Sequence, residues 1–257
     1  MTATNVKRQR GISLVEIMIA LVLSLFLSAG VIEVYLASKQ SYKAQEGYSR
    51  LQENGRYAME NLTRFIRLAG YKPYGVNSMP DDTTAFPAVT GSFAAGQVVT
   101  GSDGGGSASD SVTVRYQDDT QMGDCYSSTG DTAVHVVTFD VVGTNLRCTG
   151  NAGTEAILEG VDNLQVLYGI DTDAPADGYA NQYRDAAAVT AAGQWGAVVS
   201  VRIGLLLNTV EGVSGVADTA TFSLLGTNIA APGSADAARF MRRQPFTATI
   251  NVRNRTP

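Results

Sequence analysis

The chain contains very little histidine and cysteine: one histidine, His135, and two cysteines, Cys125 and Cys148, among 257 residues. A single histidine leaves little material for a Ser-His-Asp triad or a catalytic zinc centre. The sequence also lacks a G-x-x-x-x-G-K phosphate loop and a G-x-S-x-G nucleophile elbow, and the glycines at 104–106 lack dinucleotide-site spacing. We therefore expect no enzyme activity, no cofactor and no metal site.

Positive charge is also scarce, with 19 Lys and Arg residues against 24 Asp and Glu residues and a net charge of −5. Without the N-terminal cations Lys7, Arg8 and Arg10, 16 basic residues face 24 acidic ones, a net charge of −8. Proteins that bind nucleic acid need a basic surface to neutralise the phosphates. We therefore exclude nucleic acid as the main ligand.

Proline is absent before Pro73, and this part of the chain contains an apolar run, residues 12–32, with a single charged residue, Glu16. The run reaches the roughly 20 residues that a membrane-spanning helix needs. The cations before it place that end in the cytoplasm and everything after Ile32 outside. A secretory signal cleaved near residues 28–30 is the alternative interpretation.

The carboxylate of Glu16 costs about 2.5 to 3.5 kcal/mol in a membrane on insertion scales, unless a cation neutralises it. If the chain were cut after Gly11, the new α-amino group of Ile12 would lie one helical turn before Glu16. A neighbouring copy shifted along the helix axis could then present its own amine to this carboxylate. Cleavage would create the cation, and stacking of subunits would deliver it.

The segment from Lys7 to Glu16, KRQRGISLVE, resembles the class III signal of type IV prepilins and type II secretion pseudopilins. The resemblance implies that a prepilin peptidase cuts between Gly11 and Ile12 and methylates the new amine. It also implies that Glu16 is the subunit-assembly residue. The family's first mature residue is most often Phe or Met, whereas here it is Ile12.

The helical pattern continues beyond the apolar run. Small and apolar residues recur at alternating spacings of four and three from Ala44 to Ala69, with charged residues between them. The sequence predicts one helix over residues 12–69, ended by Gly70 in a left-handed cap. Residues 12–32 form its transmembrane or filament-core part and residues 33–70 its amphipathic part, for which a coiled-coil stalk is the alternative. Many family members have a proline in the membrane segment, so local melting of this helix on assembly stays open.

After Tyr71 the sequence changes to short alternating segments and glycine-rich stretches. We expect strands at 111–116, 133–141, 156–158, 164–170, 197–207 and 246–252, and loops at 91–110 and 171–181. Alternation places Arg115 on the face opposite Val112 and Val114, which suits a sheet with one buried side. The predicted fold class is α+β and pilin-like: one long N-terminal helix, with a membrane half and an amphipathic half, packed on an antiparallel β-sheet head domain. Residues 1–11 would be the leader and residues 71–257 the β-rich periplasmic head.

Within the family the chain is similar to PilW-type minor pilins and to J-type minor pseudopilins. The similarity lies in the segments 51–58 (LQENGRYA), 158–161 (LEGV), 165–171 (QVLYGID), 199–206 (VSVRIGLL), 242–246 (RRQPF) and 251–255 (NVRNR). It implies a tip subunit of a type IV pilus that joins other minor pilins and the major pilin in a priming complex and supports a large adhesin and twitching motility. The head would lie in the periplasm, anchored to the inner membrane, and at the pilus tip after assembly. The alternatives are a minor pseudopilin of a type II secretion system and, from another class, a membrane-anchored periplasmic enzyme or ligand binder.

Three smaller features lie in the exported region. A disulfide between Cys125 and Cys148 would close a ring of about 24 residues and contribute about 3 kcal/mol, and two free thiols are the alternative. Asp171, Asp173 and Asp177 resemble a calcium loop but lack its closing Glu, so we expect a solvated acidic turn. Five arginines make the C-terminus locally basic, either as a docking face for another subunit or as scattered surface charges: Arg239, Arg242, Arg243, Arg253 and Arg255.

Overall fold

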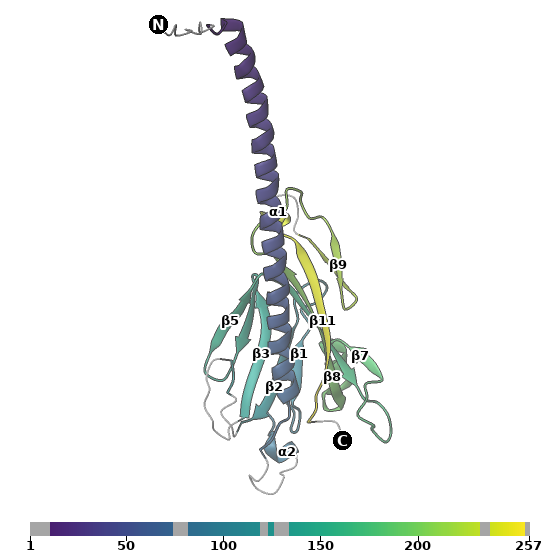
Figure 1. Cartoon of the computed structure of the whole chain (residues 1–257). Helices are drawn as coiled ribbons and strands as arrows, with labels where there is room; N and C mark the ends of the chain where they lie inside the picture. Colours follow the sequence, from purple (N-terminus) through teal and green to yellow (C-terminus); the bar gives the residue numbers. More distant parts are fainter. Residues whose placement is uncertain (1–10, 74–81, 119–122, 126–133, 232–236, 255–257) are drawn as a thin grey trace, which may run out of the picture. The chain divides into compact units, whose positions relative to one another are not determined.

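The computed structural model describes residues 11–73, 82–118, 123–125, 134–231 and 237–254. Within these ranges the chain forms two units, Met1–Glu46 and Gly47–Pro257 (Figure 1). Lys7, Arg8 and Arg10 of the predicted leader and the C-terminal Arg255 lie outside the described residues.

Helix α1 spans Leu14–Leu68, which agrees with the predicted helix to within two residues at each end. No proline interrupts it, and it ends before Gly70, whose φ of +77° is the predicted left-handed cap. The Gly70 N–H donates to the Arg115 carbonyl at 2.9 Å. The side chain of Asn254 donates to the Ala69 carbonyl at 3.1 Å, so a residue 185 positions later caps the last turn of the helix.

The first sheet contains five antiparallel strands in the order β1-β2-β3-β4-β5. The strands are β1 (Val99–Ser102), β2 (Ser111–Gln117), β3 (Val134–Val142), β4 (Asn145–Thr149) and β5 (Thr154–Glu159). Gly160 follows β5 with a φ of +85°. This backbone conformation, which glycine adopts without a steric penalty, leads the chain directly into the second sheet.

The second sheet is also antiparallel and has the order β11-β8-β6-β7. Its strands are β6 (Val161–Ile170), β7 (Gln182–Arg184), β8 (Val198–Asn208) and β11 (Arg243–Asn251). A separate hairpin contains β9 (Thr221–Leu224) and β10 (Thr227–Ala230). The short helices are α2 (Asp82–Ala85), α3 (Ala186–Ala192) and two 3-10 turns, Trp195–Ala197 and Ala237–Phe240.

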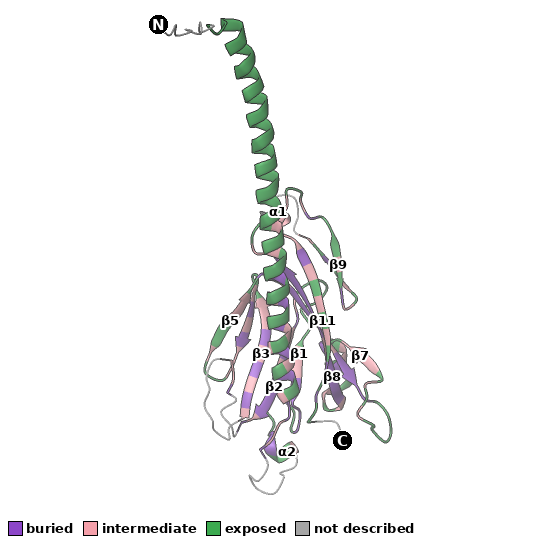
Figure 2. Cartoon of the chain, in the orientation of Figure 1, coloured by how far each residue is buried: buried purple, intermediate pink, exposed green. Residues whose placement is uncertain are grey.

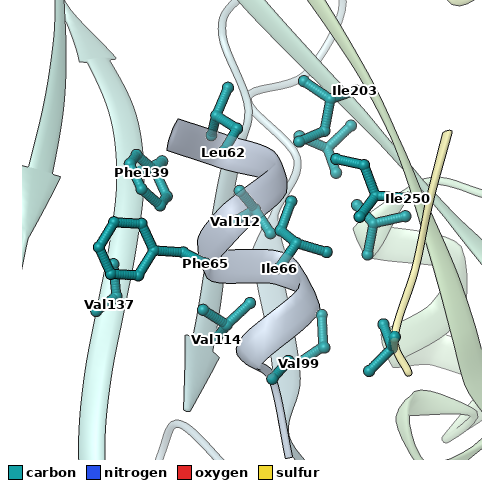
Figure 3. Close-up of a cluster of buried hydrophobic side chains, with 14 of the residues drawn as sticks. Leu62, Phe65, Ile66, Val99, Val112, Val114, Val137, Phe139, Ile203 and Ile250 are labelled. Carbon is teal, nitrogen blue, oxygen red and sulfur yellow. The ribbon is translucent and has the colours of Figure 1, made fainter. Parts of the chain in front are cut away.

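The core of the second unit forms where the end of α1 packs against both sheets. Figure 3 shows Leu62, Phe65 and Ile66 of α1 among side chains of β2, β3, β8 and β11. The ring of Phe65 lies 5.6 Å from the ring of Phe139 on β3. Each such side chain gains about 1.5–3 kcal/mol from full burial. The predicted stripe is thus buried from Leu51 onward, which excludes a coiled-coil stalk for that part of the helix, whereas Tyr48 is still 43% exposed.

The predicted α+β class is confirmed, and all six predicted strands are present, although the first residue predicted for β3, Ala133, lies outside the described residues. The loop predicted at 91–110 is wrong in part, because it contains β1. Gly101 of β1 lies against the Tyr168 hydroxyl, where a Cβ atom would collide with it. The close packing of the two sheets therefore requires a glycine at position 101. In the sequence, glycine in this region indicates a loop. Strands β4, β7, β9 and β10 are short and were also not predicted.

The prediction that places Arg115 on an open sheet face is wrong, because its side chain is only 1% exposed. Its guanidinium donates to the carbonyls of Phe86, Pro87 and Ala94 at 3.1, 2.7 and 2.9 Å. Its Nε donates to the Gln97 carbonyl. The segment 86–97 thus covers this part of β2 and is held there by one arginine, whose pKa is lowered by burial.

Replacing Gly55 by alanine should destabilise the head. Alanine normally stabilises a helix by about 1 kcal/mol relative to glycine, but a Cβ here would overlap the Phe246 ring of β11. We expect Gly55→Ala to lower the free energy of unfolding by about 1–3 kcal/mol in urea titrations of a fragment starting at Ser38. Phe246→Leu in the same fragment should recover part of the loss. A Gly55→Ala fragment as stable as the unmodified one would contradict this packing.

Replacing Arg115 by methionine should lower the free energy of unfolding more than Gly55→Ala does, because it leaves the buried carbonyls of segment 86–97 without their donor. We expect the same urea titrations to show a loss of about 3 kcal/mol or more. Arg202→Met is the matched control. Arg202 lies 3.9 Å from the centroid of the Tyr183 ring at the surface, and its loss should cost about 1 kcal/mol or less. Equal losses for the two variants would show that segment 86–97 does not depend on Arg115.

Candidate assembly segment and other candidate sites

The candidate processing residues lie at the start of α1. Gly11 and Ile12 precede the first helical turn, and the Ser13 carbonyl accepts the backbone N–H groups of Glu16 and Ile17 at 3.1 and 3.2 Å. Among the described residues, no atom lies within 4 Å of the position that a Cβ on Gly11 would take. The rest of the described chain therefore does not cover the bond between Gly11 and Ile12. Glu16 lies in the first turn of the helix, where the helix dipole favours a negative charge.

The helix surface that follows is apolar and has no cover within the first unit. All of residues 11–43 are exposed, and Figure 2 shows this part of α1 in the colour of exposed residues. Its large apolar side chains include Leu14, Ile17, Leu21, Leu25, Phe26 and Val31, each at least half exposed. By length and composition, α1 is the one helix among the described residues that could cross a membrane. An apolar surface of this size indicates contact with lipid or with other protein chains.

Polar side chains inside this apolar segment are bonded within the helix. The Ser24 hydroxyl donates to the Leu21 carbonyl at 2.9 Å, and the Ser28 hydroxyl donates to the Ser24 carbonyl at 2.8 Å. Such internal bonds are what an environment without water requires. Glu16 differs, because an ionised carboxylate in that environment needs a cation as its partner.

The two cysteines are joined by a disulfide, with their Cα atoms 6.1 Å apart. Cys148 is fully buried on β4, opposite Phe139 of β3. Cys125 lies in the described segment 123–125, which the bond therefore ties to the first sheet. The alternative of two free thiols is excluded. His135 of β3 is also buried and stacks on Tyr116 with a centroid distance of 5.5 Å.

The carboxylates of Asp171, Asp173 and Asp177 lie within 4.8 Å of one another. Both oxygens of Asp171 accept backbone N–H groups, from Asp173 at 3.0 Å and from Gly178 at 2.7 Å. Asp177 accepts the N–H of Tyr179 at 2.9 Å. These bonds hold the turn between β6 and β7. The prediction of a solvated turn is wrong for Asp171, which is buried, whereas Asp173 and Asp177 are exposed.

The C-terminal arginines do not form one docking face. The side chain of Arg243 is fully buried, and its Nε donates to Asp162 at 2.6 Å. Asn208 donates to the other oxygen of Asp162 at 2.6 Å, so the network joins β6, β8 and β11. Arg242 donates to Ser214 at 2.7 Å. The sequence shows that the five arginines are close along the chain. It does not show that the side chain of Arg243, on β11, is buried.

Two family models match the chain: Type IV Pilus-assembly protein W over residues 127–254, and the prokaryotic N-terminal methylation motif over residues 6–32. Among curated proteins there is no significant match. A solved type IV-like pilin from Thermus thermophilus is similar, with 15% identity, a TM-score of 0.46, and coverage of 80% of this chain and 98% of that chain. The two family matches confirm the predicted resemblance. The chain carries a PilW domain and the N-terminal methylation motif of type IV pilins.

Proposed function

We propose that this protein is a minor pilin that acts in the tip and priming complex of a type IV pilus, initiates pilus assembly, and supports adhesion and twitching motility. The observation that carries the proposal is the uncovered apolar surface of α1 with Glu16 in its first turn. A helix with this surface is stable only when lipid or other helices cover it. Both environments are available to a pilin, first in the membrane and then in the filament.

Cleavage between Gly11 and Ile12 by prepilin peptidase supplies the missing cation. The α-amino group of a neighbouring subunit then neutralises Glu16 and favours assembly over the membrane-embedded monomer. In this scheme residues 1–11 are the leader, 12–32 the membrane or filament-core segment, 33–70 the amphipathic segment and 71–257 the periplasmic head.

The partners in this scheme are prepilin peptidase, the major pilin, other minor pilins and a large tip adhesin. The protein begins in the inner membrane and ends at the pilus tip on the cell surface. Deleting the gene distinguishes a pilus subunit from a minor pseudopilin. Loss of surface fibres and twitching supports the proposal, whereas loss of secreted enzymes with intact fibres contradicts it.

Changing Gly11 to glutamate should trap the full-length precursor, because the peptidase must accept a small residue at the cleaved bond. Mass spectrometry of the membrane-extracted protein should find a methylated N-terminus at Ile12 in the unmodified protein and the intact leader in Gly11→Glu. Gly30→Ala is the control, since no atom lies within 4 Å of a Cβ placed there. If Gly11→Glu yields a processed product of unchanged size, the chain is cleaved at a different bond.

Glu16→Ala should insert into the membrane normally but enter fibres at least about tenfold less, because the attraction to the neighbouring amine is lost. The measurement is the amount of this subunit in sheared fibres relative to membranes. Glu33→Ala is the matched control, because Glu33 lies on the same helix just after the apolar run. Normal incorporation of Glu16→Ala would refute the assigned role.

A further inference from the structure

A groove of about 350 Å³ opens on the first sheet, on the face that points away from α1. Val112, Val114 and Phe139 point toward α1 in Figure 3. Because side chains alternate along a strand, Thr113 and Thr138 point to the opposite face, into the groove. The loop 89–93 forms one side of the groove, and β1, β2 and β3 form its floor.

The described residues that line the groove are rich in hydroxyl groups and carry no charge. Its residues are Val89, Gly91, Ser92, Phe93, Thr100, Gly101, Ser102, Ser111, Thr113, Val136 and Thr138. The hydroxyls of Ser102 and Ser111 lie 2.7 Å apart, and those of Thr113 and Thr138 lie 2.8 Å apart. In each pair one hydroxyl donates to the other, which leaves a second hydrogen and several lone pairs for a ligand.

The loop that walls the groove is held rigidly. Its ends are closed by two backbone hydrogen bonds between Val89 and Phe93, at 2.8 and 3.0 Å. Beneath it, the Arg115 guanidinium lies 4.5 Å from the centroid of the Phe93 ring and bonds the carbonyls of Pro87 and Ala94. Burying a guanidinium is costly, and its donors are used here to fix the loop. Because the loop 89–93 is already ordered, little conformational entropy is lost when a ligand binds beside it.

We propose that this groove binds a neutral carbohydrate. The hydroxyl pairs match the donors and acceptors of sugar hydroxyl groups, and Val89 and Val136 can contact their C–H faces. The absence of charged side chains from the lining leaves nothing to neutralise an ionic ligand. Asp140, further along the same face of β3, is already paired with Arg147. The volume lies at the low end of small-molecule sites, about 300–1,000 Å³, which suits one end of a glycan chain.

An added polypeptide strand would bind along the free edge of β1, not on the face of the sheet over β2. Peptides that extend a sheet bind at its edge, where backbone groups are unpaired. The floor strand β2 pairs with β1 on one side and with β3 on the other. A ligand on this face therefore meets side-chain hydroxyls instead of backbone donors.

The test uses the full chain in a zwitterionic detergent without sugar groups, titrated with the neutral oligosaccharides cellotetraose, maltotetraose and tetra-N-acetylchitotetraose and followed by saturation-transfer NMR. We expect at least one of these to bind, and Thr113→Val with Thr138→Val to weaken it about tenfold or more. Thr149→Val with Thr154→Val is the matched control. These hydroxyls also pair across two strands, 2.9 Å apart, but do not line the groove.

Several results would overturn the proposal. They are no binding of any of the three oligosaccharides, equal weakening in the test and control variants, and tighter binding of a sulfated oligosaccharide or a Ser/Thr-rich peptide than of the neutral sugars. If Thr113→Val with Thr138→Val fails to fold, Ser102→Ala with Ser111→Ala removes the other hydroxyl pair and should weaken binding in the same way. The measurement does not require pilus assembly, so it stands independently of the proposed function.

Discussion

The head depends on the burial of one helix stripe by two sheets. Part of the inner face of each sheet would be exposed without α1, and the stripe from Leu51 to Ala69 would be exposed without both sheets. The glycine at position 55 lets the Phe246 ring of the second sheet approach the helix backbone. This packing lies within the second unit, and residues 11–43 of α1 are exposed.

Periodicity and composition predicted the long helix, its cap at Gly70 and the longer strands, because these depend on local patterns of apolar residues. They did not predict β1, because close packing against Tyr168 requires a glycine in a strand. Arg115 and Arg243 were expected at the surface, since sequence alone does not show that the segment 86–97 or the carboxylate of Asp162 will cover them. For the candidate assembly segment, the charge pattern at Glu16 was enough to suggest a role. The groove could not be predicted, because its hydroxyls come from three strands whose pairing brings them together.

Arg115, Arg243 and Glu16 are charged residues in apolar surroundings, and they differ in where their partners lie. The guanidinium of Arg115 donates hydrogen bonds to backbone carbonyls, and that of Arg243 pairs with a carboxylate. Both sets of partners lie within the head. Glu16 lies in an apolar segment in which the serine hydroxyls bond to the helix itself. A charge whose partner must come from another molecule makes stability depend on assembly, whereas the two arginines find their partners within the head and need no second molecule.

The position of β11 determines when the head can fold during synthesis. This strand forms the edge of the second sheet, Ile250 and Val252 complete the core, and Asn254 caps the helix that was made nearly two hundred residues earlier. The stripe of α1 must therefore stay unburied until almost the whole chain has been synthesised. During that interval it is an exposed apolar surface of the kind that favours aggregation.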